Sequence, residues 1–271
     1  MVFTALDGSL LDARTFSYEA AKASLRRLAA GGVPVIPVTT RTFAEARSLA
    51  ERLDIEGPIV IEAGGGIARR VGSSWRVEAC AVETKRLRAA VPLIERRTSA
   101  RLRLYSSMRL DEAAVASGLT GMDLRRSMQR HFDEPFLLES GTLDEVVRAA
   151  EALGLRVRSS GRFHHLSGAS DKGCAAQRVR DEIARSLGVP PFVVALGVSP
   201  MDADFLALAD VPIIVPRADG TADPFLRALL PEAKLAPVAG PRGWANAIDE
   251  IARNLGAVVG RESGRDHAAT S

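Results

Sequence analysis

Three short apolar segments of this chain are each followed by residues that suit the binding of a ligand. The polar or glycine-rich residues are Asp7-Gly8-Ser9 after residues 2–6, Thr39-Thr40 at the end of residues 33–40, and Glu62-Ala63-Gly64-Gly65-Gly66 after residues 58–61. Backbone amides in glycine turns can point at an anion without help from a metal. Three consecutive glycines are also costly to order, which favours a backbone that something must approach closely.

A lysine adds a positive charge to this set. The chain has only four lysines, Lys22, Lys85, Lys172 and Lys234, and otherwise uses arginine as its basic residue. Lys172 lies in the first turn of a predicted helix over 171–187, where the helix dipole disfavours a cation. We therefore expect Lys172 to line a binding site, with Arg41 as a second source of positive charge.

Short β-branched runs alternate with amphipathic stretches, which is typical of parallel strands joined by crossover helices. Ligands bind at the carboxyl ends of the strands in such an open α/β sheet. We predict strands over 2–6, 33–40, 58–61, 192–196 and 211–215. Helices are predicted over 18–30, 42–53, 171–187, 202–209 and 244–255.

Between residues 80 and 166 the pattern changes to short strands mixed with helices, which predicts an α+β insertion. We predict helices over 84–97, 111–117, 122–130 and 143–153, and strands over 101–105, 135–138, 155–158 and 162–166. The predicted domains are a discontinuous α/β core (1–80 and 167–258), an inserted cap (81–166) and a flexible tail (259–271).

Composition narrows the class of protein. The 271 residues are 46% hydrophobic and 25% charged, so disordered and collagenous classes are excluded. The net charge is +3, but basic and acidic residues are interleaved, so we expect no nucleic-acid partner. No apolar run suits a membrane span or a signal peptide, so we expect a cytoplasmic protein without membrane contact. Cys80 and Cys174 are expected to be unbridged packing residues.

Seven motifs in order resemble one known family. Residues 3–11 (FTALDGSLL) are similar to the D-x-D-G-T-L-L motif of haloacid dehalogenase (HAD) superfamily phosphatases, and Thr39 or Thr40, Lys172 and residues 197–202 (GVSPMD) resemble the remaining three HAD motifs. Residues 62–66, 161–165 (GRFHH) and 240–244 (GPRGW) are similar to E-N-G-G-G, G-R-F-[WY]-H and G-P-E-G-[FW] of mannosyl-3-phosphoglycerate phosphatases. The resemblance implies a Rossmann-like three-layer HAD core with a parallel sheet and an inserted α+β cap.

The resemblance also implies roles for residues. In the family, the first aspartate of the first motif attacks phosphorus, a second one two residues later acts as acid and base, and Mg²⁺ neutralises charge. Asp7 stands at the acid/base position, and Lys172 with a hydroxyl from Thr39 or Thr40 is expected to hold phosphate oxygens. Arg162 and His164 are expected to face the ligand, where an arginine suits a carboxylate or a phosphate. Asp202 either lines the site or caps the helix that follows.

The sequence departs from the family pattern where the chemistry is concentrated. Ala5 stands at the position of the nucleophile, Val198 at a metal carboxylate and Met201 at the asparagine of the fourth motif, and Ala63 replaces the asparagine of the glycine loop. A methyl group neither attacks phosphorus nor binds a cation, and loss of a nucleophile costs on the order of 10⁴-fold in rate. We expect no metal and no cofactor, or Mg²⁺ only if the altered site still binds it.

Three hypotheses remain open at this stage. In the first, the chain binds a phosphorylated or acidic sugar or glycerate with little turnover. In the second, it is an active enzyme, either a phosphate-monoester hydrolase or one that uses a buried Asp7 for metal-independent acid/base chemistry such as hydrolysis, isomerisation or elimination. In the third, its fold serves as an interaction module for a protein partner or a second copy. An inactivating substitution of a sugar-phosphate phosphatase would account for Ala5 alone, but not for Val198 and Met201.

Overall fold

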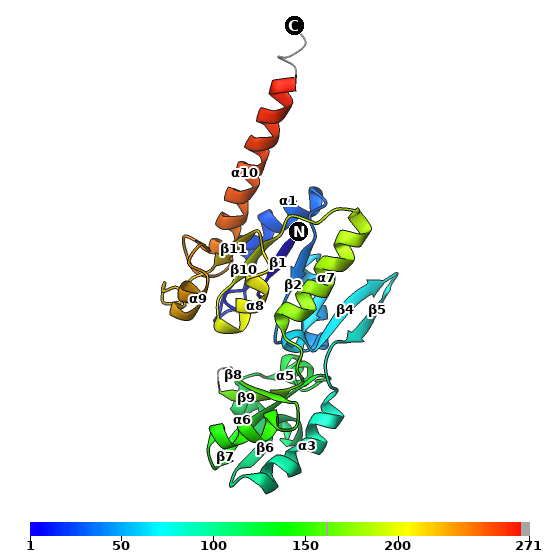
Figure 1. The fold of residues 1–271 in the computed structure, drawn as a ribbon, viewed down its shortest axis with the longest axis vertical. Coiled ribbons are helices and arrows are strands. Elements are labelled where there is room, and N and C mark those ends of the chain that lie inside the picture. Colours follow the sequence, from blue (N-terminus) through cyan, green and yellow to red (C-terminus); the bar gives the residue numbers. More distant parts are fainter. Residues whose placement is uncertain (161, 267–271) are drawn as a thin grey trace. The chain divides into compact units, whose positions relative to one another are not determined.

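The computed structural model describes residues 1–160 and 162–266, and the chain divides into two compact units. The first unit combines residues 1–35 with residues from 192 onwards, and the second comprises 36–191 (Figure 1). The domain boundaries predicted at 80, 167 and 258 stay a prediction.

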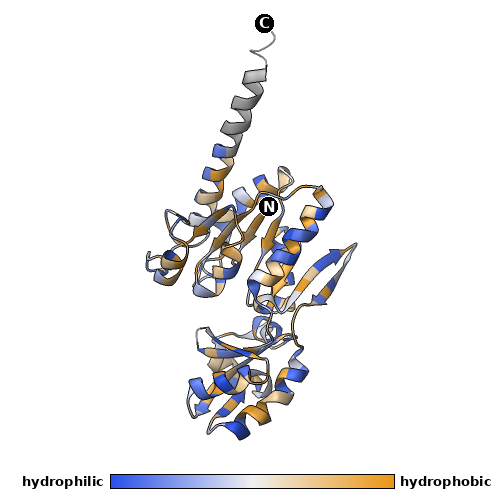
Figure 2. Ribbon diagram, in the orientation of Figure 1, coloured by the Kyte–Doolittle hydropathy of each residue, from blue (hydrophilic) through white to orange (hydrophobic). Residues whose placement is uncertain are grey.

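The first unit is built on a parallel sheet, as predicted for an α/β fold. Its strands are β1 (Val2–Thr4), β10 (Val194–Gly197), β11 (Val211–Ile214) and β12 (Lys234–Leu235). The strand order is β12-β11-β10-β1-β2, where β2 (Val35–Pro37) begins at the last residue of the unit. β1, β10 and β11 are largely hydrophobic in Figure 2, because strands of a parallel sheet are buried on both faces.

Helical segments complete this unit. They are η1 (Glu19–Ala21), α1 (Lys22–Ala30), η4 (Pro200–Asp202), α8 (Ala203–Leu206), α9 (Pro224–Leu229) and α10 (Gly240–Asp266). The prediction that the last helix ends near residue 255 is wrong, because α10 continues to Asp266. Residues 267–271 of the predicted tail lie outside the described residues. No proline follows Pro241, and helical hydrogen bonds do not need an apolar period to continue.

The second unit begins with β2 continuing from the first and then forms α2 (Phe43–Leu53), β3 (Ile59–Ile61), η2 (Glu62–Gly64), β4 (Gly66–Val71) and β5 (Ser74–Ala79). Strands β3, β4 and β5 form an antiparallel sheet. The β4–β5 hairpin was not predicted. Its sequence signal is Gly72-Ser73, because a glycine in a two-residue turn favours a hairpin, and Gly72 does adopt a positive φ of 61°.

The remainder of the second unit has the mixed character predicted for the insertion. Its elements are α3 (Thr84–Arg97), β6 (Arg101–Leu104), η3 (Tyr105–Ser107), α4 (Leu110–Ser117), α5 (Gly121–Ser127), β7 (Asp133–Ser140), α6 (Leu143–Glu151), β8 (Arg156–Ser160), β9 (Phe163–Ser167) and α7 (Lys172–Leu187). The four strands form an antiparallel sheet in the order β6-β7-β9-β8.

Both cysteines are free thiols. Cys174 is exposed, which corrects the expectation of a packing residue, because Lys172, Gly173, Ala175, Ala176 and Val179 are the buried residues of α7. Across the described part of the chain, we find no helix with the length and apolar character needed to cross a membrane.

Candidate functional site

The end of β1 carries the first predicted site residues. Ala5 follows Thr4, is buried, and donates its backbone N–H to Leu196 of β10 at 2.8 Å. The Thr4 hydroxyl accepts from the indole N–H of the fully buried Trp244 at 2.9 Å, so Trp244 is a core residue of this unit. Asp7 is exposed, which contradicts the buried carboxyl that the metal-independent hypothesis requires.

The end of β10 lies beside this turn. Gly8 has φ 74°, and a Cβ built on it would meet Val198 at 3.6 Å. Asp202 is buried, and its Oδ2 accepts from Val198 N at 2.9 Å, from Ser199 N at 3.0 Å and from Ser199 Oγ at 3.1 Å. The Asp202 carboxylate therefore holds the β10–η4 turn in a capping box with Ser199.

Two hydrocarbon side chains thus follow the ends of two neighbouring strands, β1 and β10. The donor set does not fit Mg²⁺, which requires several oxygen ligands, because Ala5 and Val198 offer none from their side chains and Asp202 is engaged by its own turn. Among the residues that the structure describes, no group of three or more His, Cys, Asp or Glu side chains could hold a metal ion.

The second unit carries the hydroxyl residues. Thr39 is buried, and its Oγ1 accepts from Arg41 N at 3.1 Å. The Thr40 carbonyl accepts from Arg130 Nη1 at 3.3 Å, and Arg41 lies 3.9 Å from the carboxylate of Glu45 on α2. Thr42, where a helix was predicted to begin, is the N-cap of α2 in a capping box, and its hydroxyl also donates to the Arg126 carbonyl at 2.9 Å.

The glycine loop after β3 adopts a rare backbone conformation. Glu62, Ala63 and Gly64 have φ of 47°, 56° and 94°, so three consecutive residues lie in the left-handed region. The buried Glu62 carboxylate accepts the backbone N–H of His131 at 3.0 Å and that of Phe132 at 2.7 Å. Charge-assisted hydrogen bonds of this kind are strong enough to stabilise a strained backbone.

The chain itself makes the close approaches that the three glycines permit. A Cβ on Gly64 would lie 2.0 Å from the Asp171 carbonyl oxygen, and one on Gly65 would lie 2.3 Å from Phe132 Cβ. A Cβ on Gly66 would lie 2.5 Å from the Phe132 ring. Packing thus explains why glycine is required at these three positions. A ligand role for Gly64 and Gly65 stays a prediction.

Ala63→Asn is expected to stabilise the protein. A left-handed alanine costs about 1–2 kcal/mol, and asparagine tolerates this conformation better. We expect the free energy of unfolding to rise by about 0.5–1 kcal/mol and the midpoint of thermal unfolding by roughly 1–4 °C, measured by calorimetry. A matched Ala89→Asn at an exposed position of the helix α3, where asparagine has the lower propensity, should destabilise instead. An unchanged or lowered midpoint in Ala63→Asn would contradict the explanation.

Lys172 is the first residue of α7 and is only 4% exposed. The helix is capped by Asp171, whose Oδ1 accepts from Cys174 N at 2.8 Å. Ser170 donates its hydroxyl to the Gly64 carbonyl at 2.9 Å, so the start of α7 packs directly on the glycine loop. Within the second unit, the structure therefore brings Gly64 and Lys172 together.

Arg162 and His164 have local partners. Arg162 donates to the Val115 carbonyl near the end of α4 at 3.4 Å. The His164 ring lies 5.5 Å from the Phe136 ring, its Nδ1 is 2.8 Å from Ser159 Oγ, and burial lowers its pKa. Gly161 of the same motif lies outside the described residues.

A set of charged residues was missed by the sequence reasoning. Arg130 Nη1 donates to Asp133 Oδ2 at 2.6 Å, and His165 Nδ1 lies 2.8 Å from the same oxygen. Asp133 is 1% exposed, and a buried carboxylate needs such partners. His165 was interpreted as a packing or surface residue. The sequence signal for this set was weak: Asp133 stands at the start of a strand, close in sequence to the basic residues Arg130 and His131.

The predicted site residues divide between the units. Ala5, Asp7, Gly8 and Asp202 belong to the first, and Thr39, Thr40, Arg41, Gly64, Gly65, Arg162, His164 and Lys172 belong to the second.

Comparison with known proteins places the chain in a family. No family model matches it. It is 32% identical to a glucosyl-3-phosphoglycerate/mannosyl-3-phosphoglycerate phosphatase of Methanococcoides burtonii, covering 94% of this chain and 98% of that protein. It is 27% identical to the protein of the same name from Persephonella marina, with the same coverage of both chains.

Solved structures confirm the fold. A haloacid dehalogenase-like hydrolase from Bacteroides thetaiotaomicron superposes with a TM-score of 0.64 at 17% identity, covering 92% of this chain and 98% of that one. At this identity the likeness concerns the fold alone. The structure therefore has a haloacid dehalogenase-like fold. The relative at 32% identity shows that the chain belongs to the glucosyl-3-phosphoglycerate/mannosyl-3-phosphoglycerate phosphatase family.

Proposed function

We propose that this protein binds a phosphorylated or acidic sugar or glycerate and that it turns this ligand over slowly or not at all by the Mg²⁺-dependent route of HAD phosphatases. The observation that carries the proposal is the pair Ala5 and Val198, two hydrocarbon side chains that follow the ends of the neighbouring strands β1 and β10. Neither side chain can accept a phosphoryl group or offset the charge of a divalent cation.

Phosphate binding is assigned to the second unit. The proposed contacts are the Thr39 or Thr40 hydroxyl, Arg41, Lys172 and amides of the glycine loop. The position of Lys172 supports this assignment, because this buried cation starts α7 where the helix packs on the glycine loop. A ligand role for Asp7 and Gly8, in the turn after β1 of the first unit, stays a prediction, and Asp202 is proposed to hold the β10–η4 turn of the same unit.

The exposed position of Asp7 argues against the alternative of metal-independent acid/base chemistry. Such chemistry relies on a carboxyl group that is shielded from bulk water. An exposed carboxylate in a turn lacks that environment.

The proposal is tested by binding and turnover in parallel. Mannosyl-3-phosphoglycerate, the compound named by the curated relatives, is titrated into the protein by calorimetry with Mg²⁺ or with EDTA. We expect binding in the micromolar to millimolar range in both conditions and no phosphate release above the buffer rate. Rapid phosphate release that needs Mg²⁺ would overturn the loss of turnover, and absence of binding would overturn the ligand assignment.

A further inference from the structure

One side of α7 contacts the β4–β5 hairpin through residues spaced by one helical turn. Glu182 accepts two hydrogen bonds from Arg69 of β4, at 2.6 and 2.9 Å. One turn nearer the start of the helix, Arg178 donates to the carboxylate of Glu78 on β5. Residues four positions apart share one face of a helix, so the next residue on this side of α7 is Cys174.

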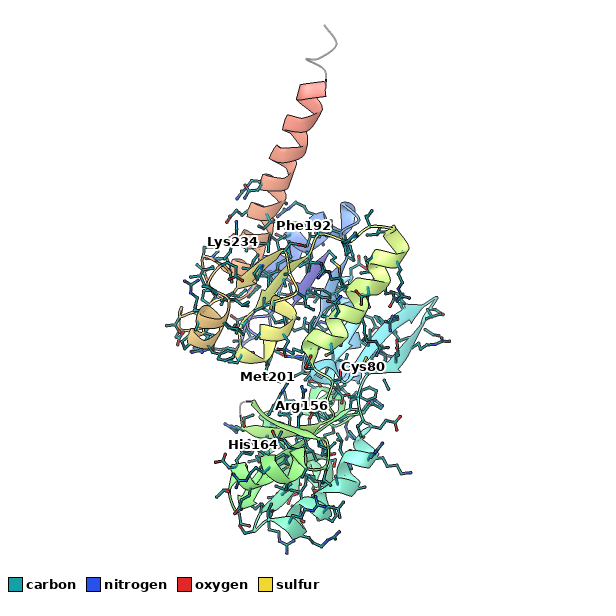
Figure 3. All side chains as sticks on the ribbon, viewed as in Figure 1. Cys80, Arg156, His164, Phe192, Met201 and Lys234 are labelled. Atoms are coloured by element: carbon teal, nitrogen blue, oxygen red, sulfur yellow. The ribbon has the colours of Figure 1, made fainter. Side chains whose placement is uncertain are left out.

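The hairpin presents its side chains at a matching spacing. Arg69 of β4 pairs directly with Arg76 of β5. Because side chains alternate along a strand, Glu78 and then Cys80 follow on the same face. Two residues of a strand advance by about 6.6 Å and four residues of a helix by about 6.0 Å, so each turn of α7 matches one such step. The next step in this series brings Cys174 to Cys80, which is labelled in Figure 3.

Two contacts of the Cys80 thiol agree with this placement. Its Sγ accepts from Arg178 Nη1 at 3.1 Å, and Arg178 is one turn from Cys174 on the same side of α7. The two thiols also interact electrostatically. Burial raises the pKa of the Cys80 thiol, Arg69 lowers it and the Cys174 thiol raises it again. Because such an interaction weakens with distance, the fold has brought the two cysteines of this chain close together.

The glycine loop holds the backbone of both cysteines. The Gly65 carbonyl accepts the N–H of Cys80 at 2.8 Å. The Gly64 carbonyl accepts the hydroxyl of Ser170 at 2.9 Å, just before the turn of α7 that contains Cys174. These two anchors stand at the two ends of residues 81–173, which contain the whole β6-β7-β9-β8 sheet. A bond between the thiols would therefore tie the beginning of this segment to its end.

We propose that Cys80 and Cys174 form a modification site, a dithiol that a small-molecule disulfide converts reversibly into an intramolecular disulfide. The thiolate of the exposed Cys174 attacks one sulfur of the small disulfide, whose S–S bond breaks and whose other half leaves as a thiolate. The thiolate of the half-buried Cys80 then attacks the Cys174 sulfur of the mixed disulfide, and the second small thiolate leaves. The protein gives up two electrons and two protons, and the small disulfide takes them up to become two thiols.

The test measures the equilibrium between reduced and bridged protein in glutathione redox buffers, for the native protein and for the protein unfolded in urea. The buffers are held above neutral pH, because partial desolvation raises the pKa of both thiols and only a thiolate attacks a disulfide. After acid quenching and alkylation, peptide mapping gives the ratio of bridged to reduced chains. In the same buffer, we expect this ratio to be at least ~10-fold higher for the native wild type than in urea.

The matched control is the double variant Cys174→Ser/Asp181→Cys, which moves the exposed thiol by about 10 Å along the same helix. This variant should lose the native advantage in bridging, and Cys80→Ser should form only a mixed disulfide at Cys174. A wild-type ratio no higher in the native protein than in urea would overturn the inference, and so would a native ratio in the double variant equal to that of the wild type. Either result would leave the proposed function standing, because no thiol belongs to the proposed ligand contacts.

Discussion

Ala5→Asp alone is expected to leave phosphate release from mannosyl-3-phosphoglycerate at the wild-type level, whereas the triple variant Ala5→Asp/Val198→Asp/Met201→Asn gains Mg²⁺-dependent release by on the order of 10³-fold or more. Ala5 and Val198 follow the ends of paired strands, so both carboxylates would appear at one edge of the sheet. A nucleophile without metal ligands faces an uncompensated negative charge as it approaches phosphate.

The measurement is phosphate release at saturating substrate, with Mg²⁺ and with EDTA. Val198→Asp/Met201→Asn without Ala5→Asp is the matched control, because it supplies metal ligands without a nucleophile and should stay inactive. Full activity of Ala5→Asp alone would indicate that a single substitution inactivated an otherwise complete site. A silent but folded triple variant would show that further parts of the site have been lost.

Gly64→Ala is expected to destabilise the protein by more than about 4 kcal/mol or to prevent folding. Two penalties combine at this position. The backbone has φ 94°, which L side chains rarely adopt, and the new Cβ would lie 2.0 Å from the Asp171 carbonyl oxygen and 2.7 Å from Lys172 N. These atoms are backbone at the start of α7, so relief of the clash requires the helix and the loop to separate.

Gly72→Ala separates the two penalties. Gly72 has φ 61° in the β4–β5 turn, and a Cβ built there meets no atom within 4 Å. In this control the free energy of unfolding should fall only by the cost of a left-handed alanine, about 1–2 kcal/mol. Chemical denaturation of both variants gives the comparison. A loss in Gly64→Ala as small as that in Gly72→Ala would show that α7 and the glycine loop adjust easily.

Much of the fold follows from local sequence signals. The helix predicted over 42–53 matches α2, and the structure shows Thr42 at its N-cap with both hydrogen bonds of a capping box to Glu45. The helix predicted over 84–97 matches α3, because its apolar positions Leu87, Val91 and Ile94 recur at helical spacing. These features depend on residues within one or two turns of each other, which a single sequence displays directly.

The candidate site was less predictable because its contacts join distant positions. A ligand contact by His164 stays a prediction, and what the sequence did not reveal is that alternation and register place its ring with Phe136 and that of His165 with Asp133. The face of a strand depends on which side the helices cover, and the strand pattern does not contain this information. Likewise, the glycines of the loop are explained by Phe132 and Asp171, which are far along the chain.

The carboxylate of Glu62 reaches backbone N–H groups 69 and 70 positions later in the chain. Contacts of such separation form only after a long loop has closed, so they arise late in folding, when nearby helices and hairpins are already present. The left-handed conformations of Glu62 and Ala63 thus cannot be stabilised by this carboxylate until β7 has docked. The loop that borders Lys172 is accordingly among the last parts of the second unit to acquire its native shape.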